Sequence, residues 1–198
     1  ELFALADAAG DRKPIVLVLG LCGLRWGEMA GLHVGDVDFA RHRLHVVRSA
    51  SEVGHEIVVD TPKSGDGRLV AFPDVLTPLL CEACAGRDPD AILFPAPDGG
   101  YMPRVHGPNN RSSWFFWAKR RAGISKPLTF HDLRHTAASL MVRSGANVKA
   151  VQRQLGHRSA AMTLDVYADL FDDDLDAVGE AMDALLSAEC GQNVGKSV

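Results

Sequence analysis

The spacing of the apolar residues changes twice along this chain, and those changes limit the folds that it can adopt. Residues 2–32 follow a helical period, with a buried apolar helix expected over 15–24 that is entered through Pro14. Short stretches rich in Val, Ile and Leu then predict strands at 43–48, 56–60 and 68–72. From Asp74 onward the helical period returns. We therefore expect an α+β fold that is mainly α-helical, with a small three-stranded antiparallel β-sheet near the N-terminal third.

The helical region after Asp74 divides at capping residues. Thr129 is followed three residues later by Asp132, which is a helix N-cap signal, and Asn147 and Ser159 can cap the next two helices. The pattern predicts helices at 74–85, about 107–122, 129–144, 148–155 and 159–168. A chain of 198 residues is long enough for one domain with a substantial core.

Four cysteines show no spacing typical of a disulfide framework or of paired metal-binding motifs. The lone pair Cys81 and Cys84 lies in a helical stretch, which favours buried or partly buried thiols over zinc or redox chemistry. These thiols fit a reducing cytoplasm. The apolar run at 15–24 is about half of the ~20 residues that a membrane-spanning helix needs, so we expect no contact with a membrane.

The net charge of −4 is unevenly distributed along the chain. Residues 165–198 contain nine acids and one base, which leaves 16 of the 25 acids and 20 of the 21 bases in residues 1–164. The body of the chain is therefore mildly basic and its tail is acidic. Residues 103–130 hold basic and aromatic side chains without a carboxylate. Basic side chains there can neutralise phosphates, although a solvated helix face gives the same pattern. The candidate DNA contacts are Arg104, Arg111, Lys119, Arg120 and Arg121.

Several separated residues have the chemistry to exchange a phosphodiester through a tyrosine ester. Such a reaction needs a nucleophile, an acceptor for its proton, cations over the non-bridging oxygens and an acid for the leaving alkoxide. The chain has two tyrosines: Tyr101 lies in a loop rich in Pro and Gly, and Tyr167 lies on a short helical segment after His157. Tyr167 is the better candidate for the nucleophile.

Arg25 and Arg134 are the candidate phosphate-binding cations, because a planar guanidinium donates two hydrogen bonds to phosphate oxygens and stays charged. Glu28, three residues after Arg25, can hold that guanidinium by an ion pair. His131 precedes Arg134 by three residues on one predicted helix, so both side chains can reach a single phosphate. An imidazole with a pKa near 6.5 can accept the tyrosine's proton at neutral pH. His135 points about 100° away on the same helix and is given a supporting role.

Lys63 and His157 complete the candidate set. Lys63 lies in a predicted turn between two strands, from which its ammonium can protonate a leaving oxygen, and His157 follows Gly156 where its N–H can reach a phosphate oxygen. Taken alone, each candidate has an ordinary alternative: a turn lysine, a capping histidine, a surface arginine or a packed tyrosine.

The order and spacing of these residues resemble the tyrosine recombinase (phage integrase) family over about residues 12–170. The resemblance is carried by Gly23-Leu24-Arg25 with Glu28, by His131-Asp132-Leu133-Arg134-His135-Thr136, by Leu155-Gly156-His157, and by Thr163 to Tyr167. It implies that Tyr167 attacks a DNA phosphate to give a 3′-phosphotyrosyl link and a free 5′ hydroxyl, with Lys63 as the general acid. A 5′ hydroxyl of a partner strand then reverses the step through a Holliday junction, without metal, ATP or any other cofactor.

The resemblance also implies how the chain is organised and what it binds. Residues 1–170 correspond to the catalytic domain, 171–188 to an amphipathic C-terminal helix, and 189–198 to a tail that we expect to be disordered. The apolar stripe of that helix docks either on its own domain or on a neighbouring protomer, and the sequence leaves both open. The expected partners are double-stranded DNA, further copies in a tetramer, and accessory directionality or DNA-bending proteins, in a cytoplasmic, nucleoid-associated setting.

Two other functions have to be distinguished from an integrase of a phage or other mobile element. A type IB topoisomerase uses similar residues to relax supercoils as a monomer, and a non-catalytic DNA-binding module needs none of the reactive side chains. The chain opens at Glu1 directly in a helical pattern, so we expect it to be a fragment of a longer protein. Full-length members of the family carry an N-terminal helical domain that closes around DNA, and this domain is not part of the sequence.

Overall fold

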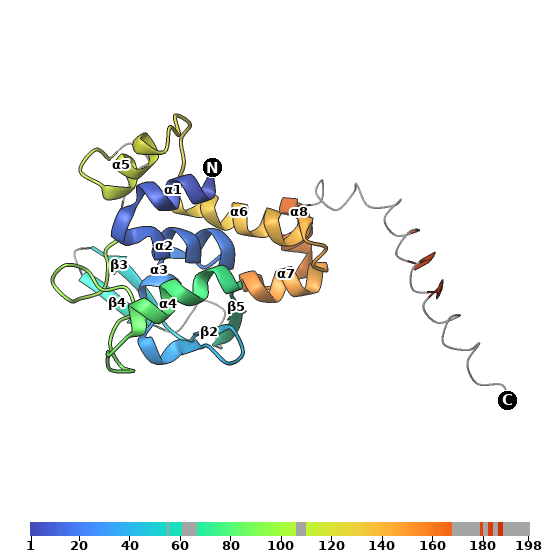
Figure 1. The fold of residues 1–198 in the computed structure, drawn as a ribbon, viewed down its shortest axis with the longest axis horizontal. Helices are drawn as coiled ribbons and strands as arrows, with labels where there is room; N and C mark the ends of the chain where they lie inside the picture. The colour runs from blue at the N-terminus through green and yellow to red at the C-terminus, as the bar shows by residue number, and fades with distance from the viewer. Residues whose placement is uncertain are drawn as a thin grey trace.

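The computed structural model describes residues 1–54, 56–60, 67–105 and 110–167, with five further positions near the C-terminus: 179, 182, 183, 186 and 187. Helices make up about half of this part of the chain, and the strands gather on one side of it (Figure 1). The expected mainly helical α+β fold is therefore confirmed. The expected C-terminal helix at 171–188 and the expected disordered tail lie almost entirely outside the described residues.

The N-terminal helices form the centre of the molecule. They are α1 (Leu2–Ala8), the 3₁₀ turn η1 (Gly10–Arg12), α2 (Lys13–Leu17), the π-helical turn η2 (Val18–Cys22) and α3 (Trp26–Ala30). The apolar run predicted as one helix thus widens into a π turn, and it ends at Gly23 with φ +72°. A left-handed glycine ends a helix at little cost because it has no Cβ to clash. This sharp stop places Arg25 at the start of α3.

The strands form two small antiparallel sheets. Their bounds are β1 (Val37–Asp38), β2 (Arg43–Val46), β3 (Ser49–Val53), β4 (Glu56–Asp60) and β5 (Arg68–Ala71), with the 3₁₀ turn η3 (Val34–Asp36) before β1. The three-stranded sheet has the order β1-β2-β5, and β3 pairs only with β4. The predicted single sheet of 43–48, 56–60 and 68–72 is therefore wrong in its pairing. The strands β1 and β3 were not predicted from the sequence, because β1 has only two residues and β3 buries only Ala50.

The later helices agree well with the sequence pattern. They are the 3₁₀ turn η4 (Asp74–Leu76), α4 (Thr77–Cys84), α5 (Trp114–Arg121), α6 (Phe130–Arg143), α7 (Val148–Leu155) and α8 (Ala160–Tyr167). Only α5 starts well away from its predicted position. Ser113 caps it, because the serine hydroxyl accepts a hydrogen bond from the Phe115 backbone N–H at 3.1 Å. No helix among the described residues is both long and apolar enough to cross a membrane.

The main core joins the N-terminal helices to the start of α6 and to β5, and a second, smaller apolar cluster joins α6 to α7. The η2 turn packs on α6, and α7 packs on β5. Fully buried Leu133 on α6 and Leu155 on α7 help to fix these contacts. The packing brings three segments that are far apart in the sequence to one place: the start of α3, the start of α6 and the end of α7.

Candidate active site

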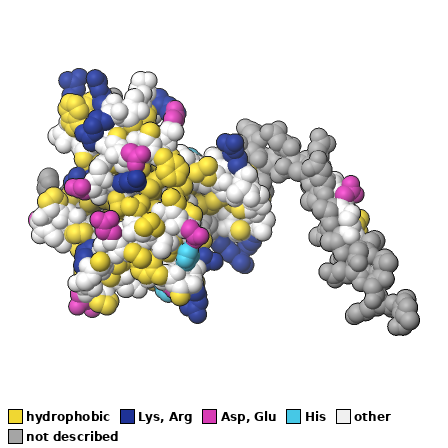
Figure 2. All heavy atoms as spheres, in the orientation of Figure 1, with side chains coloured by type: hydrophobic (Ala, Val, Ile, Leu, Met, Phe, Trp, Pro, Cys, Tyr) yellow, Lys and Arg dark blue, Asp and Glu magenta, His cyan; other side chains and the backbone are white. Residues whose placement is uncertain are grey.

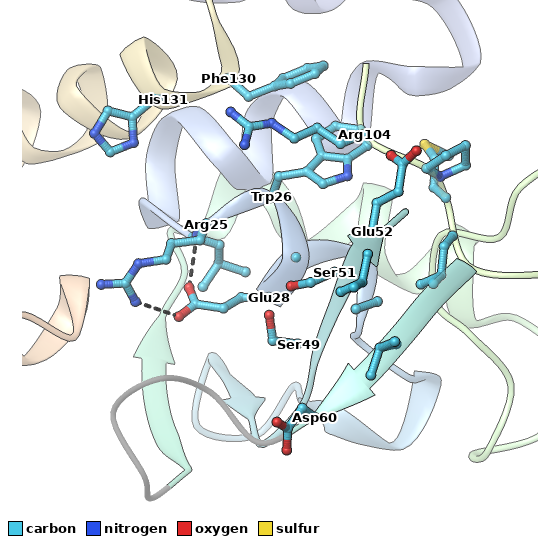
Figure 3. Close-up of a pocket in the computed structure, with 18 of the residues that line it drawn as sticks. Arg25, Trp26, Glu28, Ser49, Ser51, Glu52, Asp60, Arg104, Phe130 and His131 are labelled. Carbon is cyan, nitrogen blue, oxygen red and sulfur yellow. Dashed lines mark hydrogen bonds and ion pairs between the residues drawn. The ribbon is translucent and has the colours of Figure 1, made fainter. Parts of the chain in front are cut away.

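Arg25 stands at the N-terminus of α3, where Glu28 holds it from two sides. The Glu28 carboxylate accepts hydrogen bonds from the Arg25 backbone N–H at 2.8 Å and from its guanidinium at 2.9 Å (Figure 3). The side chain of Glu28 is 2% exposed and that of Arg25 is 39% exposed. The carboxylate is therefore a buried anchor, while the guanidinium still reaches the surface. The predicted pairing of Glu28 with Arg25 is present.

Arg134 lies on α6 and joins the two neighbouring segments. It is 3% exposed, and its guanidinium donates to the backbone oxygens of Gly23 at 2.5 Å and Leu155 at 2.6 Å. One carbonyl belongs to the segment before Arg25 and the other to the segment before His157. Arg134 thus places a buried positive charge between the two segments and connects them.

His131 occupies the first turn of α6 beside Arg134. Thr129 caps this helix: its hydroxyl and backbone N–H both contact the Asp132 carboxylate at 2.7 Å. The His131 ring lies edge-on against that of His135, with 4.7 Å between the centroids. Partial burial, followed by the electrostatic effects of His135 and Arg134, lowers the pKa of His131, against the opposing effect of Asp132. The imidazole is therefore neutral at pH 7 and able to accept a proton.

His157 follows α7, which ends at Gly156 with φ +68°. Its Nδ1 lies 2.9 Å from the hydroxyl of Thr163, which is fully buried. Burial, followed by the nearby charges of Arg134 and Arg25, lowers the pKa of His157 to about 4. Arg25 also reaches this segment, because its Nη2 lies 3.4 Å from the Gly156 carbonyl oxygen.

A pocket of about 530 Å³ opens between α3, α6 and the β3–β4 hairpin. Arg25, His131 and Arg134 line one part of it, and Figure 3 shows His131 above Arg25 in the view. Arg104 lies near Trp26 in another part. Three of the six predicted catalytic residues therefore share one pocket, and hydrogen bonds connect the segment of a fourth, His157, to Arg25 and Arg134.

The remaining two predicted catalytic residues are described only partly or not at all. Tyr167 is the last residue of α8, of which the backbone is described and the tyrosine side chain is not. Lys63 belongs to residues 61–66, between β4 and β5, which lie outside the described residues. Their roles remain predictions.

The candidate DNA contacts in 103–130 divide into exposed and buried side chains. Arg104, Arg111, Arg120 and Arg121 are exposed. Lys119 is 4% exposed, and its ammonium donates to the Leu128 carbonyl oxygen at 3.2 Å. α5 turns Lys119 toward the core, unlike the four exposed arginines, and the contacts of all five residues with DNA stay predictions. Figure 2 shows dark blue Lys and Arg side chains gathered near α5 and again near α7 on the face in view.

Arg68 is the residue of the site that sequence reasoning missed. Its guanidinium forms a two-pronged ion pair with Glu28, at 2.7 Å from Oε1 and 2.9 Å from Oε2. Burial raises the pKa of Glu28, but the hydrogen bonds from Arg68 and Arg25 outweigh it and hold the pKa below its usual value. A signal was present: in β5 the strand alternation places Arg68 on the same face as buried Val70. A charged residue on a core-facing position predicts a buried partner of opposite charge.

The charges of the site favour an anion. The guanidinium groups of Arg134, Arg25 and Arg68 all lie close enough to His157 to lower its pKa, and Glu28 pairs with the last two. Guanidinium groups in this arrangement suit phosphate oxygens. Among the described residues, no group of three or more His, Cys, Asp or Glu side chains is arranged to hold a metal ion.

The chain belongs to the phage integrase family of tyrosine recombinases, whose sequence model matches residues 4–173. It is 33% identical over 171 residues to the tyrosine recombinase XerD of Pseudomonas putida, covering 80% of this chain and 50% of the relative. It is 31% identical over 152 residues to a tyrosine recombinase of Thermosipho africanus, covering 77% of this chain and 47% of that protein. The chain thus spans about half the length of these relatives.

The fold is also that of solved structures. The Tn1549 transposon integrase in complex with transposon right end DNA aligns with a TM-score of 0.71 at 23% identity, over 89% of this chain and 63% of that one. The XerA recombinase aligns with a TM-score of 0.62 at 25% identity, over 90% of this chain and 62% of that one. The first likeness concerns the fold alone, because its sequence identity is low.

Proposed function

We propose that this chain is the catalytic domain of a site-specific DNA recombinase, which cuts and rejoins DNA strands through a 3′-phosphotyrosyl intermediate on Tyr167. The observation that carries this proposal is the meeting of Arg25, His131 and Arg134 in one pocket, with the His157 segment hydrogen-bonded to both arginines. Arg25 is more than a hundred residues away in the sequence from His131 and Arg134, and a DNA-binding module without catalysis would not require them to meet.

The two arginines bind the scissile phosphate. Arg25 is partly exposed and carries its charge into the pocket, while the buried Arg134 supplies a second charge at the pocket wall. Both stay ionised throughout the reaction, so they stabilise the extra negative charge of the transition state. Glu28 is already paired and buried, and it holds Arg25 in place before DNA arrives.

The histidines handle protons and hydrogen bonds. Free tyrosine at pH 7 is about three pK units from ionised, which corresponds to ~4 kcal/mol that the site has to offset. A neutral His131 accepts the phenol proton as the Tyr167 oxygen attacks, and the two arginines stabilise the charge that develops. When the Thr163 hydroxyl donates to Nδ1 of His157, the ring proton is on Nε2, from which it donates to a phosphate oxygen.

The reaction exchanges one phosphodiester for another. The Tyr167 oxygen forms a bond to phosphorus, the bond from phosphorus to the 5′ oxygen breaks, and Lys63 gives its proton to that oxygen. A 5′ hydroxyl from a second strand reverses these steps and joins new neighbours. The bond that is formed resembles the bond that is broken, so the reaction needs no external source of energy.

The partner of the site is double-stranded DNA, which two observations support: the arginines Arg25, Arg104 and Arg134 that line the pocket, and the DNA in the solved complex of the similar Tn1549 integrase. We further propose that residues 1–170 form the catalytic unit, and that the helix at 171–188 joins copies into a tetramer on DNA. Accessory directionality or DNA-bending proteins then select the direction of the reaction, in a cytoplasmic, nucleoid-associated setting.

A nicked suicide substrate tests this function. The full-length protein is incubated with DNA that carries its recombination site, and a denaturing gel reports a covalent adduct. The wild type and Tyr101→Phe form the adduct, whereas Tyr167→Phe does not. A folded wild type that binds DNA and forms no adduct contradicts the proposal. Supercoil relaxation without strand exchange indicates a topoisomerase instead.

A further inference from the structure

Arg68, the first residue of β5, uses all three of its guanidinium nitrogens on partners inside the protein. Nη1 and Nη2 bind the two oxygens of Glu28, and Nε donates to the Gln154 carbonyl oxygen at 3.3 Å. The side chain is only 12% exposed. A buried arginine with such complete internal pairing holds its partners in fixed relative positions.

The first partner, Glu28, connects Arg68 to Arg25. Oε1 of Glu28 lies 2.7 Å from Arg68 and 2.9 Å from Arg25, so a single oxygen atom joins the two guanidinium groups. Glu28 has almost no contact with solvent. Without Arg68, the buried carboxylate would lose its two-pronged ion pair and would be held only by the backbone N–H and guanidinium of Arg25. It would then gain freedom to rotate, and Arg25 would move with it.

The second partner, the Gln154 carbonyl, lies three residues before His157 in the chain. Between them, Gly156 packs so closely on Arg68 that a Cβ at this position would lie 2.9 Å from the guanidinium carbon. Gln154 strengthens the same contact, because its side-chain amide binds the backbone N–H and oxygen of Ala71 at 2.9 and 2.7 Å. The start and the end of β5 are thus both hydrogen-bonded to the last turn of α7.

We propose that Arg68 is a positioning residue for strand cleavage: it keeps Glu28, and through it Arg25, aligned with the Gly156–His157 segment. This inference rests on the proposed function. Arg68 has no place on the wall of the pocket and does not contact the scissile phosphate. It acts on the phosphate only through the residues that it holds.

The test compares Arg68→Gln and Arg68→Lys with the wild type in the full-length protein. Arg48→Gln is the matched control, because Arg48 also forms a partly buried ion pair, with Asp36 at 3.2 Å, and neither residue lines the pocket. Three quantities are measured: the single-turnover rate of adduct formation at saturating protein, the Kd for DNA, and the melting temperature.

We expect Arg68→Gln to slow adduct formation by about 100-fold, as displacement of a catalytic group by ~1 Å can do. The Kd changes little, because Arg68 lies away from the pocket wall. Arg68→Lys recovers part of the rate, since an ammonium keeps the charge but cannot bind both carboxylate oxygens in a planar fork. If Arg68→Gln does not fold, the rate, Kd and melting temperature of Arg68→Lys test the proposal instead. Arg48→Gln loses stability and keeps its rate.

A pH profile separates positioning from plain structural support. In Arg68→Gln the Glu28 carboxyl becomes easier to protonate, so the cleavage rate falls further as the pH is lowered, and the double variant Glu28→Gln, Arg68→Gln lacks this added fall.

The inference is overturned by a folded Arg68→Gln that cleaves at the wild-type rate, or by an Arg48→Gln that is equally slow at the same melting temperature. Failure of the wild type to form any adduct overturns the proposed function, and the inference with it.

Discussion

The guanidinium of Arg134 donates a hydrogen bond to the carbonyl oxygen of Gly23, a residue 111 positions earlier in the chain. Gly23 ends the π turn in a left-handed conformation, and Arg25 follows two residues later. The second predicted phosphate-binding arginine thus fixes the backbone that presents the first. Binding to phosphate and the architecture of the pocket therefore depend on the same side chain.

Arg134→Lys separates these two roles. A lysine keeps the charge but cannot reach the Gly23 and Leu155 carbonyls together from one planar group. Loss of one hydrogen bond to a charged donor costs about 1.5–3 kcal/mol of unfolding free energy, which urea unfolding measures. We expect adduct formation to fall by at least about 100-fold as well, because the orientation of both segments changes. A variant with wild-type stability and activity would show that the two carbonyl contacts are dispensable.

Gly156 and Gly145 form a matched pair for substitution by alanine. Both have positive φ, +68° and +80°, so each alanine carries a similar backbone cost of about 1 kcal/mol. A Cβ at Gly156 meets Arg68, whereas a Cβ at Gly145 meets nothing within 4 Å. We expect Gly156→Ala to lose more stability than Gly145→Ala in urea unfolding and to lose most of its cleavage activity. Equal effects of the two substitutions would exclude a specific contact between Gly156 and Arg68.

His157 gives the stability of the protein a dependence on pH. Its pKa is about 4 in the folded protein and about 6.5 in an unfolded chain, so the unfolded state binds the proton first as the pH falls. The contribution of His157 is complete above pH ~6.5 and is lost progressively toward pH ~4. Because solvent reaches part of the ring, we expect a loss of about 1 kcal/mol over this window. His157→Gln removes this part of the pH dependence in urea unfolding, and an unchanged pH dependence would contradict the lowered pKa.

Lys63 can be tested through the chemistry of the leaving group. A general acid contributes roughly 100-fold or more to rate, so Lys63→Ala slows cleavage of ordinary DNA by at least that factor. A substrate with sulfur in place of the scissile 5′ oxygen releases a thiolate, which needs no proton. Lys63→Ala should cleave this substrate at nearly the wild-type rate. An equal defect on both substrates would assign Lys63 to phosphate binding.

Much of this site could be predicted from the sequence because it depends on local order and spacing. His131 and Arg134 lie one helical turn apart, and the capping pair Thr129 and Asp132 marks where that helix begins. Glu28 lies within one turn of Arg25 for the same reason. Periodicity identified α6 and α7 closely, since both bury a clear apolar face.

Contacts between distant segments could not be predicted in this way. The pairing of β2 with β5 and of β3 with β4 depends on which strands meet in space, and short strands carry little signal of it. The alternation in β5 marks Arg68 as a residue that faces the core, but only the folded chain shows that its partners are Glu28 of α3 and Gln154 of α7. Lys119 is a different case. It lies in a basic helical segment, yet its position on the helix faces the core, and the charge pattern alone does not show this.

The identity of the nucleophile is the central claim, and mapping the adduct tests it most directly. The chain contains two tyrosines, and the hydroxyl of Tyr101 lies 3.0 Å from a ring nitrogen of His33, neither of which lines the pocket of Arg25 and Arg134. The covalent complex on suicide DNA is purified, digested with protease and nuclease, and analysed by mass spectrometry. We predict that the nucleotide remnant is on the peptide that contains Tyr167. A remnant on Tyr101 or on any other residue would contradict the account.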